Sequence, residues 1–418
     1  MTFHYAVGLR IYPNKRQRRI IAKNDGVSRK TYNNLVSYNE ELFRLYKVPI
    51  YSEPIQKRIE FLREILDSKG NMLVMMPFVK DEEIDSLAID NAYVDYRSAW
   101  NQFRKVPGTQ EPCFHRKSYE QRYKTNAHLS KGARNWDDSN VYFFPYGKKG
   151  PQFINLPILG KTRFKGSSVL IQRILNHRKD TRIGSISVRR DNCGDYFISL
   201  QFHSDLPFIE RLPNTGAMIG IDMNLSNFYT DSDGNIAANP KYRRNIQKDL
   251  SKSQRILSRR QARAKEEKRN IYQARNYQKQ RLKVARLQRL QARQRDDFLN
   301  VESKRLVENQ DLIVSEDLKV KNLLRNHKLA YAISDVSWSA FFTMLGQKSS
   351  MYGKTYLKVP PHYTTQTCSE CGHVMKEEDH IALGISEWDC PVCKTHHIRD
   401  YNAAKNILNR GIEMLYSA

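Results

Sequence analysis

Apolar and polar side chains alternate over the first twelve residues, and Pro13 ends the run. This period of two predicts a strand closed by a turn. From Lys15 to about Lys47 the apolar positions recur at steps of three and four residues, which predicts an amphipathic helix. The same spacing predicts two more helices over residues 55–66 and 81–105. The N-terminal part is therefore expected to be one strand followed by a basic, aromatic-rich helical lobe.

From about residue 110 the pattern changes to short segments separated by Pro and Gly. Four strands are expected in this part, over residues 153–157, 168–174, 184–189 and 196–202. Because the first twelve residues also have the pattern of a strand, the simplest arrangement is a β module that the helical lobe interrupts.

The second half opens on a strong strand pattern over residues 216–229, in which Ile219 and Ile221 lead into Asp222 and a hairpin turn follows. Residues 241–310 then form the longest helical pattern of the chain, part of which could be a helical hairpin. Residues 311–316 have the pattern of a buried strand that ends in a carboxylate.

With 418 residues, 40% of them hydrophobic, the chain is long enough for two to four domains. Lys and Arg number 70 against 44 acidic residues, a formal net charge of +26 that indicates a polyanionic partner. Residues 241–295 alone hold 20 Lys and Arg against three acids. A run of one sign repels itself unless an anion lies along it, so we expect sequence-independent contact with phosphates. The alternative is a solvated face. The candidate contacts are Arg255, Arg259, Arg263, Arg286 and Arg289.

No run of 18 apolar residues and no signal-peptide pattern is present, so we expect no membrane segment. Four of the six cysteines fall in two Cys-x-x-Cys pairs, whereas Cys113 and Cys193 stand alone. A disulfide framework is not expected from this usage. The sequence therefore predicts a protein of the reducing cytosol, at the nucleoid of a prokaryotic cell.

The two Cys-x-x-Cys pairs are separated by 18 residues, a spacing that is typical of a zinc ribbon with one Zn²⁺ ion. A redox pair and an iron–sulfur cluster are the competing interpretations. Four thiolates close a tetrahedral site, so the nearby histidines are expected on the surface or behind the ligands. The cysteines are Cys368, Cys371, Cys390 and Cys393, and the histidines are His373, His380, His396 and His397.

Three carboxylates stand at the ends of predicted elements: Asp222 and Glu316 at the ends of strands, and Asp400 before a helix. Each alone is typical of a turn or a helix cap. If they converge, they could hold two Mg²⁺ or Mn²⁺ ions and hydrolyse a phosphodiester without a covalent intermediate. Asp317 and Asp335 are possible substitutes.

A series of motifs runs in order along almost the whole chain. This series resembles the TnpB family of transposon-encoded, RNA-guided DNA endonucleases, which are related to the small type V CRISPR effectors. The motifs are Leu9-Arg10-Ile11-Tyr12-Pro13, Gly220-Ile221-Asp222, Asp233-Gly234, Asn239-Pro240-Lys241-Tyr242, Arg295-Asp296-Asp297-Phe298, Glu316-Asp317-Leu318, Tyr352-Gly353-Lys354, Thr367-Cys368-Ser369-Glu370-Cys371-Gly372-His373 and Arg399-Asp400-Tyr401-Asn402-Ala403-Ala404-Lys405-Asn406-Ile407-Leu408.

The resemblance implies a multidomain α+β and α/β fold. Its expected parts are a split wedge-type β-barrel (1–12 and 110–210), a helical recognition lobe inserted in it (13–109), a RuvC-like, RNase H-type nuclease domain with long basic helices at 241–310 (211–366), an inserted zinc ribbon (367–396) and a C-terminal RuvC segment (397–418).

The resemblance further implies that Asp222, Glu316 and Asp400 are the RuvC carboxylates. A guide RNA would supply sequence specificity, and the protein would recognise heteroduplex shape and a short motif beside the double-stranded DNA target. One protein per RNA is expected, with a dimer left open. The alternatives are a nuclease-silent RNA-guided repressor and a strand-transfer transposase. The sequence departs from the family at Leu345-Gly346-Gln347-Lys348, where the family tends to have an acidic and aromatic pair, and at Ile398, where it has an acid.

Overall fold

The fold is given by a computed structural model, which divides into two compact units, Met1–Phe208 and Ile209–Ala418. This boundary lies two residues ahead of the one expected from the sequence. The residues that the structure describes are 3–49, 52–74, 76, 81–128, 139–144, 152–177, 180–319, 323, 333, 335–375 and 385–417.

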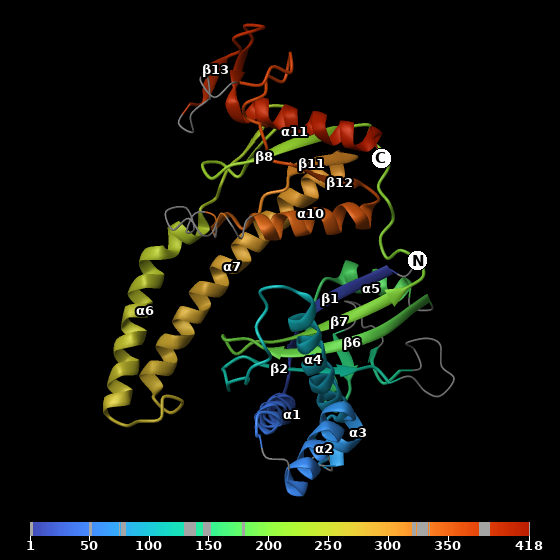
Figure 1. The fold of residues 1–418 in the computed structure, drawn as a ribbon, viewed down its shortest axis with the longest axis vertical. Helices are drawn as coiled ribbons and strands as arrows, with labels where there is room; N and C mark the ends of the chain where they lie inside the picture. Colours follow the sequence, from blue (N-terminus) through green and yellow to red (C-terminus); the bar gives the residue numbers. More distant parts are fainter. Residues whose placement is uncertain are drawn as a thin grey trace. The chain divides into compact units, whose positions relative to one another are not determined.

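The first unit contains a seven-stranded antiparallel sheet in the order β2-β6-β7-β1-β5-β4-β3 (Figure 1). The N-terminal strand β1 pairs with β7 on one side and β5 on the other, which confirms that it joins the later strands across the helical insertion. Among the described strands, β2 and β3 form free edges, so the sheet is open, whereas a barrel was expected. The strands are β1 (Phe3–Tyr12), β2 (Gln121–Asn126), β3 (Tyr142–Phe143), β4 (Phe153–Leu156), β5 (Gly160–Lys165), β6 (Thr181–Arg190) and β7 (Tyr196–Ser204).

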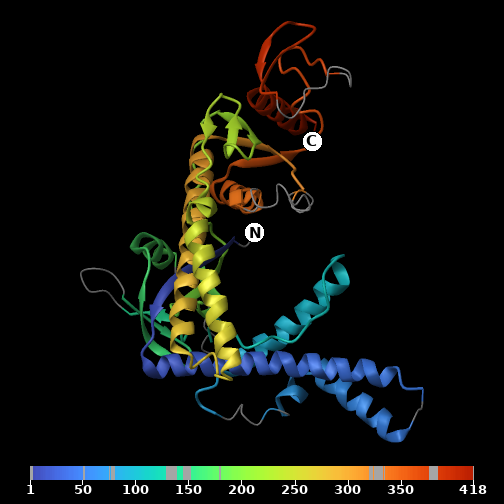
Figure 2. The same cartoon turned by 90° about the vertical axis from the view of Figure 1, so that its left-hand side faces the viewer.

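The helical insertion begins with α1 (Lys15–Tyr46), a single long helix in Figure 2. The side chains of Asn14 and Gln17 cap its first turn reciprocally. Gln17 also donates to the carbonyl oxygens of Leu159 and Lys161, at 2.9 and 3.0 Å, which ties the start of α1 to the sheet. The helices α2 (Glu53–Asp67) and α4 (Ser86–Lys105) pack on α1, and α3 (Lys69–Val74) packs on α2. All four helices contribute to one apolar core.

One predicted strand of this unit is wrong. Residues 168–174 lie in helix α5 (Ser168–Asn176). Ser167 is its N-cap, and the Ser167 side chain accepts a hydrogen bond from the Leu170 amide at 3.4 Å. Ile171 and Ile174 are buried, whereas Val169 is exposed. Burial at a three-residue step is the helical period, which a short apolar run does not distinguish from that of a strand.

The second unit contains a five-stranded sheet in the order β10-β9-β8-β11-β12. The strands β8, β11 and β12 are parallel, whereas β9 and β10 continue the sheet as an antiparallel meander. The bounds of the strands are β8 (Met218–Met223), β9 (Tyr229–Asp231), β10 (Ile236–Ala237), β11 (Leu312–Glu316) and β12 (Thr355–Val359).

Helices cover both faces of this sheet (Figure 1). The helices α7 (Arg275–Asn309) and α10 (Trp338–Tyr352) pack on one face around Phe228 and Phe341, and α11 (Arg399–Tyr416) packs on the other. Gly220 lets α11 approach closely, since a Cβ at this position would lie 2.2 Å from the carbonyl oxygen of Ala404. Gly411 plays the same part on the helix, where a Cβ would lie 2.4 Å from the side chain of Val314.

The long basic segment is a helical hairpin, in which α6 (Tyr242–Glu266) and α7 run side by side in Figures 1 and 2. The buried side chain of Gln280 donates to the carbonyl oxygen of Ser253 at 2.9 Å and joins the two helices. Beyond the sheet, the short strands β13 (Glu387–Asp389) and β14 (His396–Ile398) form an antiparallel pair directly before α11. No helix within the described ranges is both long and apolar enough to cross a bilayer.

Candidate active site and metal centre

Two neighbouring parallel strands bring Asp222 and Glu316 to one edge of the five-stranded sheet. The register pairs Val314 with Gly220 and Ser315 with Ile221, so the next residue on each strand is one of these carboxylates. Both are almost buried, with exposed fractions of 7% for Asp222 and 8% for Glu316. A buried carboxylate needs a cation or hydrogen-bond donors as partners. The groups around the ends of these two strands therefore decide what Asp222 and Glu316 can bind.

The third carboxylate, Asp400, lies in the first turn of α11, where a negative charge is favoured by the helix dipole. Its Oδ2 accepts a hydrogen bond from Asn224 Nδ2 at 3.2 Å, one residue beyond the end of β8. Its Oδ1 lies 3.4 Å from Arg399 Nε. Because Gly220 and Gly411 seat α11 directly on β8 and β11, the helix holds Asp400 beside the ends of those strands.

The charges of Glu316 and Asp400 both affect the pKa of Asp222. Burial raises the pKa of Asp222 well above its ordinary value, and the negative charges of Glu316 and Asp400 raise it further. Only Arg399 acts in the opposite direction among the contributing groups. The other two predicted acids therefore lie near enough to Asp222 for their charges to disfavour its ionised form.

Thr364 is the direct partner of Glu316 and was not predicted from the sequence. Its hydroxyl donates to Glu316 Oε1 at 2.5 Å. Burial raises the pKa of Glu316, whereas this hydrogen bond and the charge of Arg410 lower it. The neighbouring acid Asp317 instead faces Lys358, with Oδ1 3.8 Å from Nζ. Carboxylate oxygens are of the kind that Mg²⁺ and Mn²⁺ prefer as ligands. Among the described residues, the group whose ligand atoms lie close enough together to hold one metal ion consists of the four cysteines and does not include these acids.

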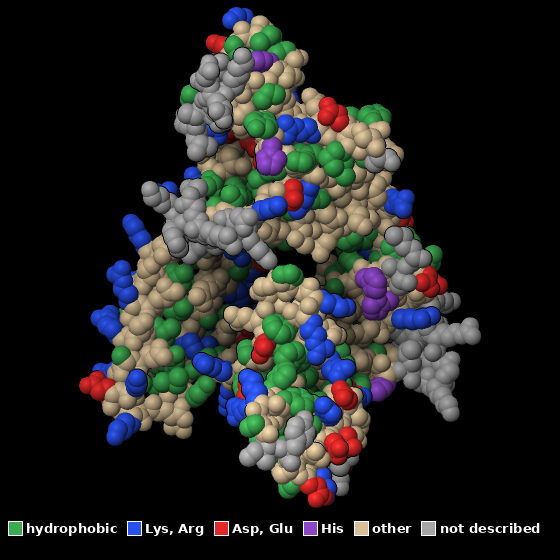
Figure 3. All heavy atoms as spheres, viewed as in Figure 1, with side chains coloured by type: hydrophobic (Ala, Val, Ile, Leu, Met, Phe, Trp, Pro, Cys, Tyr) green, Lys and Arg blue, Asp and Glu red, His purple; other side chains and the backbone are tan. Residues whose placement is uncertain are grey.

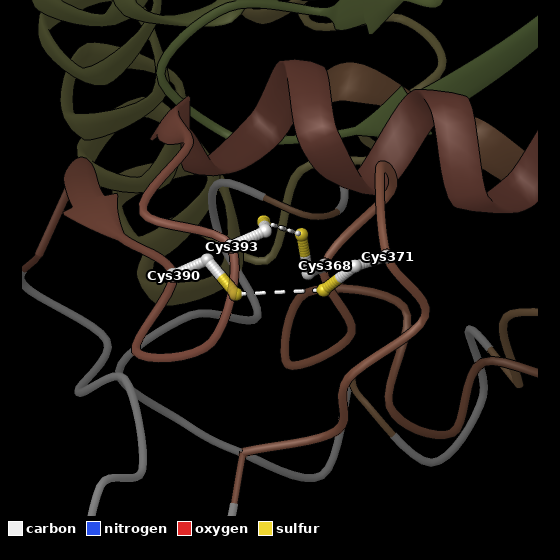
Figure 4. Close-up of side chains that lie close together, drawn as sticks. All are labelled: Cys368, Cys371, Cys390 and Cys393. Atoms are coloured by element: carbon white, nitrogen blue, oxygen red, sulfur yellow. Dashed lines mark hydrogen bonds between the residues drawn. The ribbon is translucent and has the colours of Figure 1, made fainter.

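The four predicted cysteines converge, and their sulfur atoms all lie within 4.8 Å of one another (Figure 4). Two of the separations, Cys368 to Cys393 and Cys371 to Cys390, are 3.6 Å. A disulfide would require about 2 Å, whereas four sulfurs at about 2.3 Å from one zinc ion lie about 3.8 Å apart. The sulfur atoms could hold a metal ion, and their spacing fits zinc.

Both Cys-x-x-Cys segments have the same backbone turn. The amide of the residue after the second cysteine donates to the carbonyl of the first, from Gly372 to Cys368 at 3.0 Å and from Lys394 to Cys390 at 2.9 Å. These two donors have left-handed φ values of 74° and 58°. Glycine adopts a left-handed φ more easily than lysine does. The left-handed φ of Lys394 therefore indicates that the surrounding turn imposes this backbone conformation.

His397 lies behind the sulfur cluster. Its Nε2 is 3.1 Å from Cys368 Sγ, and its ring is 4.6 Å from that of Trp388 between centroids. His396 is exposed, and its Nδ1 lies 2.8 Å from Asp389 Oδ1. That neither histidine binds the metal stays a prediction. His380 lies outside the described residues. Burial raises the pKa of the Cys368 thiol to about 12, and a bound cation would favour its thiolate.

The candidate phosphate contacts lie on the α6–α7 hairpin, and Figure 3 shows Lys and Arg along its outer edge. Arg255 and Arg259 are exposed and line a hollow on α6 together with Ser251, Gln254 and Ser258. Arg263 is exposed but pairs with Glu267 at 2.9 Å. Arg286 is exposed and Arg289 is half-buried. Arg255 and Arg259 are therefore exposed within one shallow hollow on α6.

Three family models match the chain. A model described as a probable transposase, OrfB of IS605, matches residues 196–327. A Cas12f1-like TNB domain matches residues 338–407, which include all four cysteines. A helix-turn-helix model matches residues 1–47, although the described part of this stretch forms one strand and one helix.

Two relatives bear the name of putative RNA-guided DNA endonuclease. One, from Streptomyces pristinaespiralis, is 36% identical over 229 residues, which cover 54% of this chain and 53% of the relative. The other, InsQ of Escherichia coli K12, is 30% identical over 295 residues, which cover 66% of this chain and 67% of the relative. The match thus spans about half the length of the first relative. A solved Cas12f1 complex with sgRNA and target DNA aligns at 14% identity with a TM-score of 0.34, over 97% of this chain and 99% of that one.

Proposed function

The chain belongs to the OrfB (TnpB) family, and from this membership we propose that it is an RNA-guided, divalent-metal-dependent DNA endonuclease with Asp222, Glu316 and Asp400 as its catalytic carboxylates. The names of the two relatives support the reaction and its RNA guide. The partners on this proposal are a guide RNA and a double-stranded DNA that matches it beside a short flanking motif. We expect one protein per RNA, acting in the cytosol.

The observation that supports the proposal is the parallel register that puts the buried carboxylates of Asp222 and Glu316 at the ends of neighbouring strands, with Asp400 in the first turn of the helix that packs on those strands. Three acids from two strands and one helix share one edge of a sheet, where burial and mutual repulsion raise the pKa of Asp222. Structural carboxylates are normally paired with cationic groups, whereas here Glu316 receives its direct hydrogen bond from a neutral hydroxyl. Such a set favours divalent cations.

The carboxylates would hold Mg²⁺ or Mn²⁺, and when bound these ions activate a water and stabilise the leaving oxygen of a phosphodiester. The residues of the chain supply the geometry. Parallel register fixes Asp222 beside Glu316, and the close packing of α11 fixes Asp400. Thr364 and Asn224 orient carboxylate oxygens by donating hydrogen bonds to them.

The four cysteines would hold one structural Zn²⁺ ion next to the start of α11. The second cysteine turn lies shortly before α11 in the chain. A zinc ion that joins the two turns would therefore stabilise the fold near Asp400, in the first turn of that helix. The basic hairpin of α6 and α7 would contact the phosphates of RNA or DNA, without regard to base sequence.

Cleavage of a plasmid that carries the matched sequence tests the proposal, with the RNA that co-purifies with the protein and Mg²⁺. We expect the wild-type protein to linearise or nick the plasmid, and Asp222→Ala, Glu316→Ala and Asp400→Ala each to remove cleavage while RNA binding is kept. Asp317→Ala is the matched control, because this acid neighbours Glu316 yet pairs with Lys358. It should cleave like the wild type.

Three outcomes would contradict the proposal. DNA that stays intact although it is bound would indicate an RNA-guided repressor. Joined rather than cut products on a gel would indicate strand transfer. Cleavage by Asp222→Ala at the wild-type rate would remove the carboxylates from the chemistry.

A further inference from the structure

One face of α11 carries a row of side chains that donate hydrogen bonds to the backbone carbonyls of a single segment. Asn402, Asn406 and Arg410 stand four residues apart, so they share one face of the helix. We call these three residues the α11 ladder. All three donate to carbonyl oxygens of residues 360–367, the segment that leads from the end of β12 to the first cysteine.

The hydrogen bonds of the ladder range from 2.5 to 3.2 Å in length. Arg410 Nη1 donates to the carbonyls of Pro360 and His362, at 3.2 and 2.5 Å. Asn406 Nδ2 donates to those of Thr364 and Thr367, at 2.9 and 2.6 Å. Asn402 Nδ2 donates to that of Thr367 at 2.8 Å.

The two asparagines of the ladder lie inside the fold, whereas Arg410 is half-buried. Asn402 is fully buried, Asn406 is 6% exposed and Thr364 is 2% exposed. Asparagine is a weak helix former, and buried amides cost stability unless they are bonded. Two buried asparagines on one helix face are therefore explained by the bonds they make to this segment.

The segment at residues 360–367 connects Glu316 with the first cysteine turn. At Thr364, the hydroxyl donates to Glu316, while the carbonyl of the same residue accepts from Asn406. At the other end, the Ser369 amide, next to Cys368, donates to Asn402 Oδ1 at 2.9 Å. The helix that carries Asp400 thus bonds both the partner of Glu316 and the first cysteine turn.

We propose that Thr364 is a positioning residue for Glu316, and that the α11 ladder fixes its place relative to Asp400 and to the cysteine site. The proposal rests on the proposed function, because it concerns the geometry of the same carboxylates. Thr364 is buried. It orients one oxygen of a buried carboxylate, as hydrogen-bond donors behind metal ligands generally do.

Binding of Mn²⁺ to the zinc-loaded full chain, followed by calorimetry, tests the position of Thr364. Thr364→Val keeps the shape of the side chain but removes the hydroxyl, and should weaken Mn²⁺ binding about tenfold. Thr364→Ser restores the hydroxyl and should bind Mn²⁺ like the wild type. Zinc content and the unfolding temperature should stay near the wild-type values in both variants, which a general loss of structure would not allow.

Thr367→Val is the matched control within the same segment. Its hydroxyl donates to the carbonyl of Tyr363 at 2.7 Å and makes no bond to Glu316, while its carbonyl still accepts from the ladder. This variant should keep wild-type Mn²⁺ affinity. Wild-type affinity in Thr364→Val, while Asp222→Ala abolishes binding, would overturn the role of Thr364 alone. An unchanged isotherm in Asp222→Ala would overturn the proposed metal site and this inference together.

The ladder is tested separately by Asn406→Asp, which replaces a donating amide by an acceptor that faces two carbonyl oxygens. We expect the same loss of Mn²⁺ affinity as in Thr364→Val, with the zinc content unchanged because the four sulfur atoms are intact. Wild-type Mn²⁺ affinity in a folded Asn406→Asp protein would separate Thr364 from the ladder and overturn that part of the proposal.

Discussion

Among single residues, Asp311 and Lys354 hold the edge of the sheet at which the parallel strands begin. The Lys354 side chain is fully buried and pairs with Asp311 Oδ1, and its Nζ also donates to the Pro213 carbonyl at 2.6 Å. The other Asp311 oxygen accepts from the amides of Thr215 and Gly216 at 2.8 and 2.6 Å. One carboxylate therefore joins the segments that enter β8, β11 and β12.

This arrangement predicts a pH-dependent stability. The hydrogen bond from Lys354, followed by those from the Thr215 and Gly216 amides, lowers the pKa of Asp311 to about 2. A depressed pKa stabilises the fold above the unfolded-state value of about 4. That stability is lost as the pH falls from about 4 to about 2. Asp311→Asn should therefore unfold at a lower temperature than the wild type at pH 7, and the difference should shrink toward pH 2.

Thermal unfolding followed by circular dichroism at several pH values measures this difference. Asp317→Asn serves as the control, because Asp317 is half exposed and its single ion pair with Lys358 is 3.8 Å long. A constant difference between wild type and Asp311→Asn across this pH range would exclude the pair as its source.

The acids and the cysteines could be proposed from the sequence because their residue types and spacing carry the chemistry themselves. The structure brings the four cysteines together, and the catalytic role of the acids stays a prediction. The sequence did not identify Thr364, Asn224 or the α11 ladder. Thr364 lies 48 residues from Glu316, and Asn406 lies 42 residues from Thr364. Hydroxyl and amide side chains are common on any surface, and only the packing of α11 on the sheet shows which of them are buried partners.

Among the helices and strands, the period of the apolar residues predicts the long elements correctly but not all of the short ones. The long elements α1 and α4 agree with the predicted helices to within about five residues, because several turns repeat the same period. The segment at 168–174 is a helix, since few residues leave the period ambiguous. The basic segment at 241–310 is broken between α6 and α7, so the hairpin alternative is correct.

The hollow on α6 leads to a prediction about salt. Replacement of both Arg255 and Arg259 by Gln should weaken nucleic-acid binding at every base sequence. It should also flatten the slope of log affinity against log salt by about 1.5, because two phosphate contacts are lost. Fluorescence anisotropy with labelled RNA and DNA at several salt concentrations measures this slope.

Arg263→Gln is the control on the same helix, because the guanidinium of Arg263 is engaged by Glu267 at 2.9 Å. It should change the slope less than the double replacement does. A slope that stays the same in the double variant would mean that the face of α6 is solvated.

In the whole molecule, all four cysteines and the three carboxylates belong to the second compact unit, Ile209–Ala418. Removal of the metal by a chelator, or Cys390→Ser, should therefore increase amide hydrogen exchange over β13, β14 and the start of α11. The first unit should exchange as before. Exchange measured by mass spectrometry tests this, and full protection of the second unit in a protein without metal would contradict a structural role for zinc.

The position of Asp400 on α11 also bears on protein synthesis. On the proposed function, the basic hairpin and two of the acids are translated first, and the third acid follows more than 80 residues after Glu316. A chain that is interrupted before residue 400 could hold nucleic acid but would lack the last carboxylate. On that proposal, the order of the elements would delay nuclease activity until the start of α11, which carries Asp400, has left the ribosome.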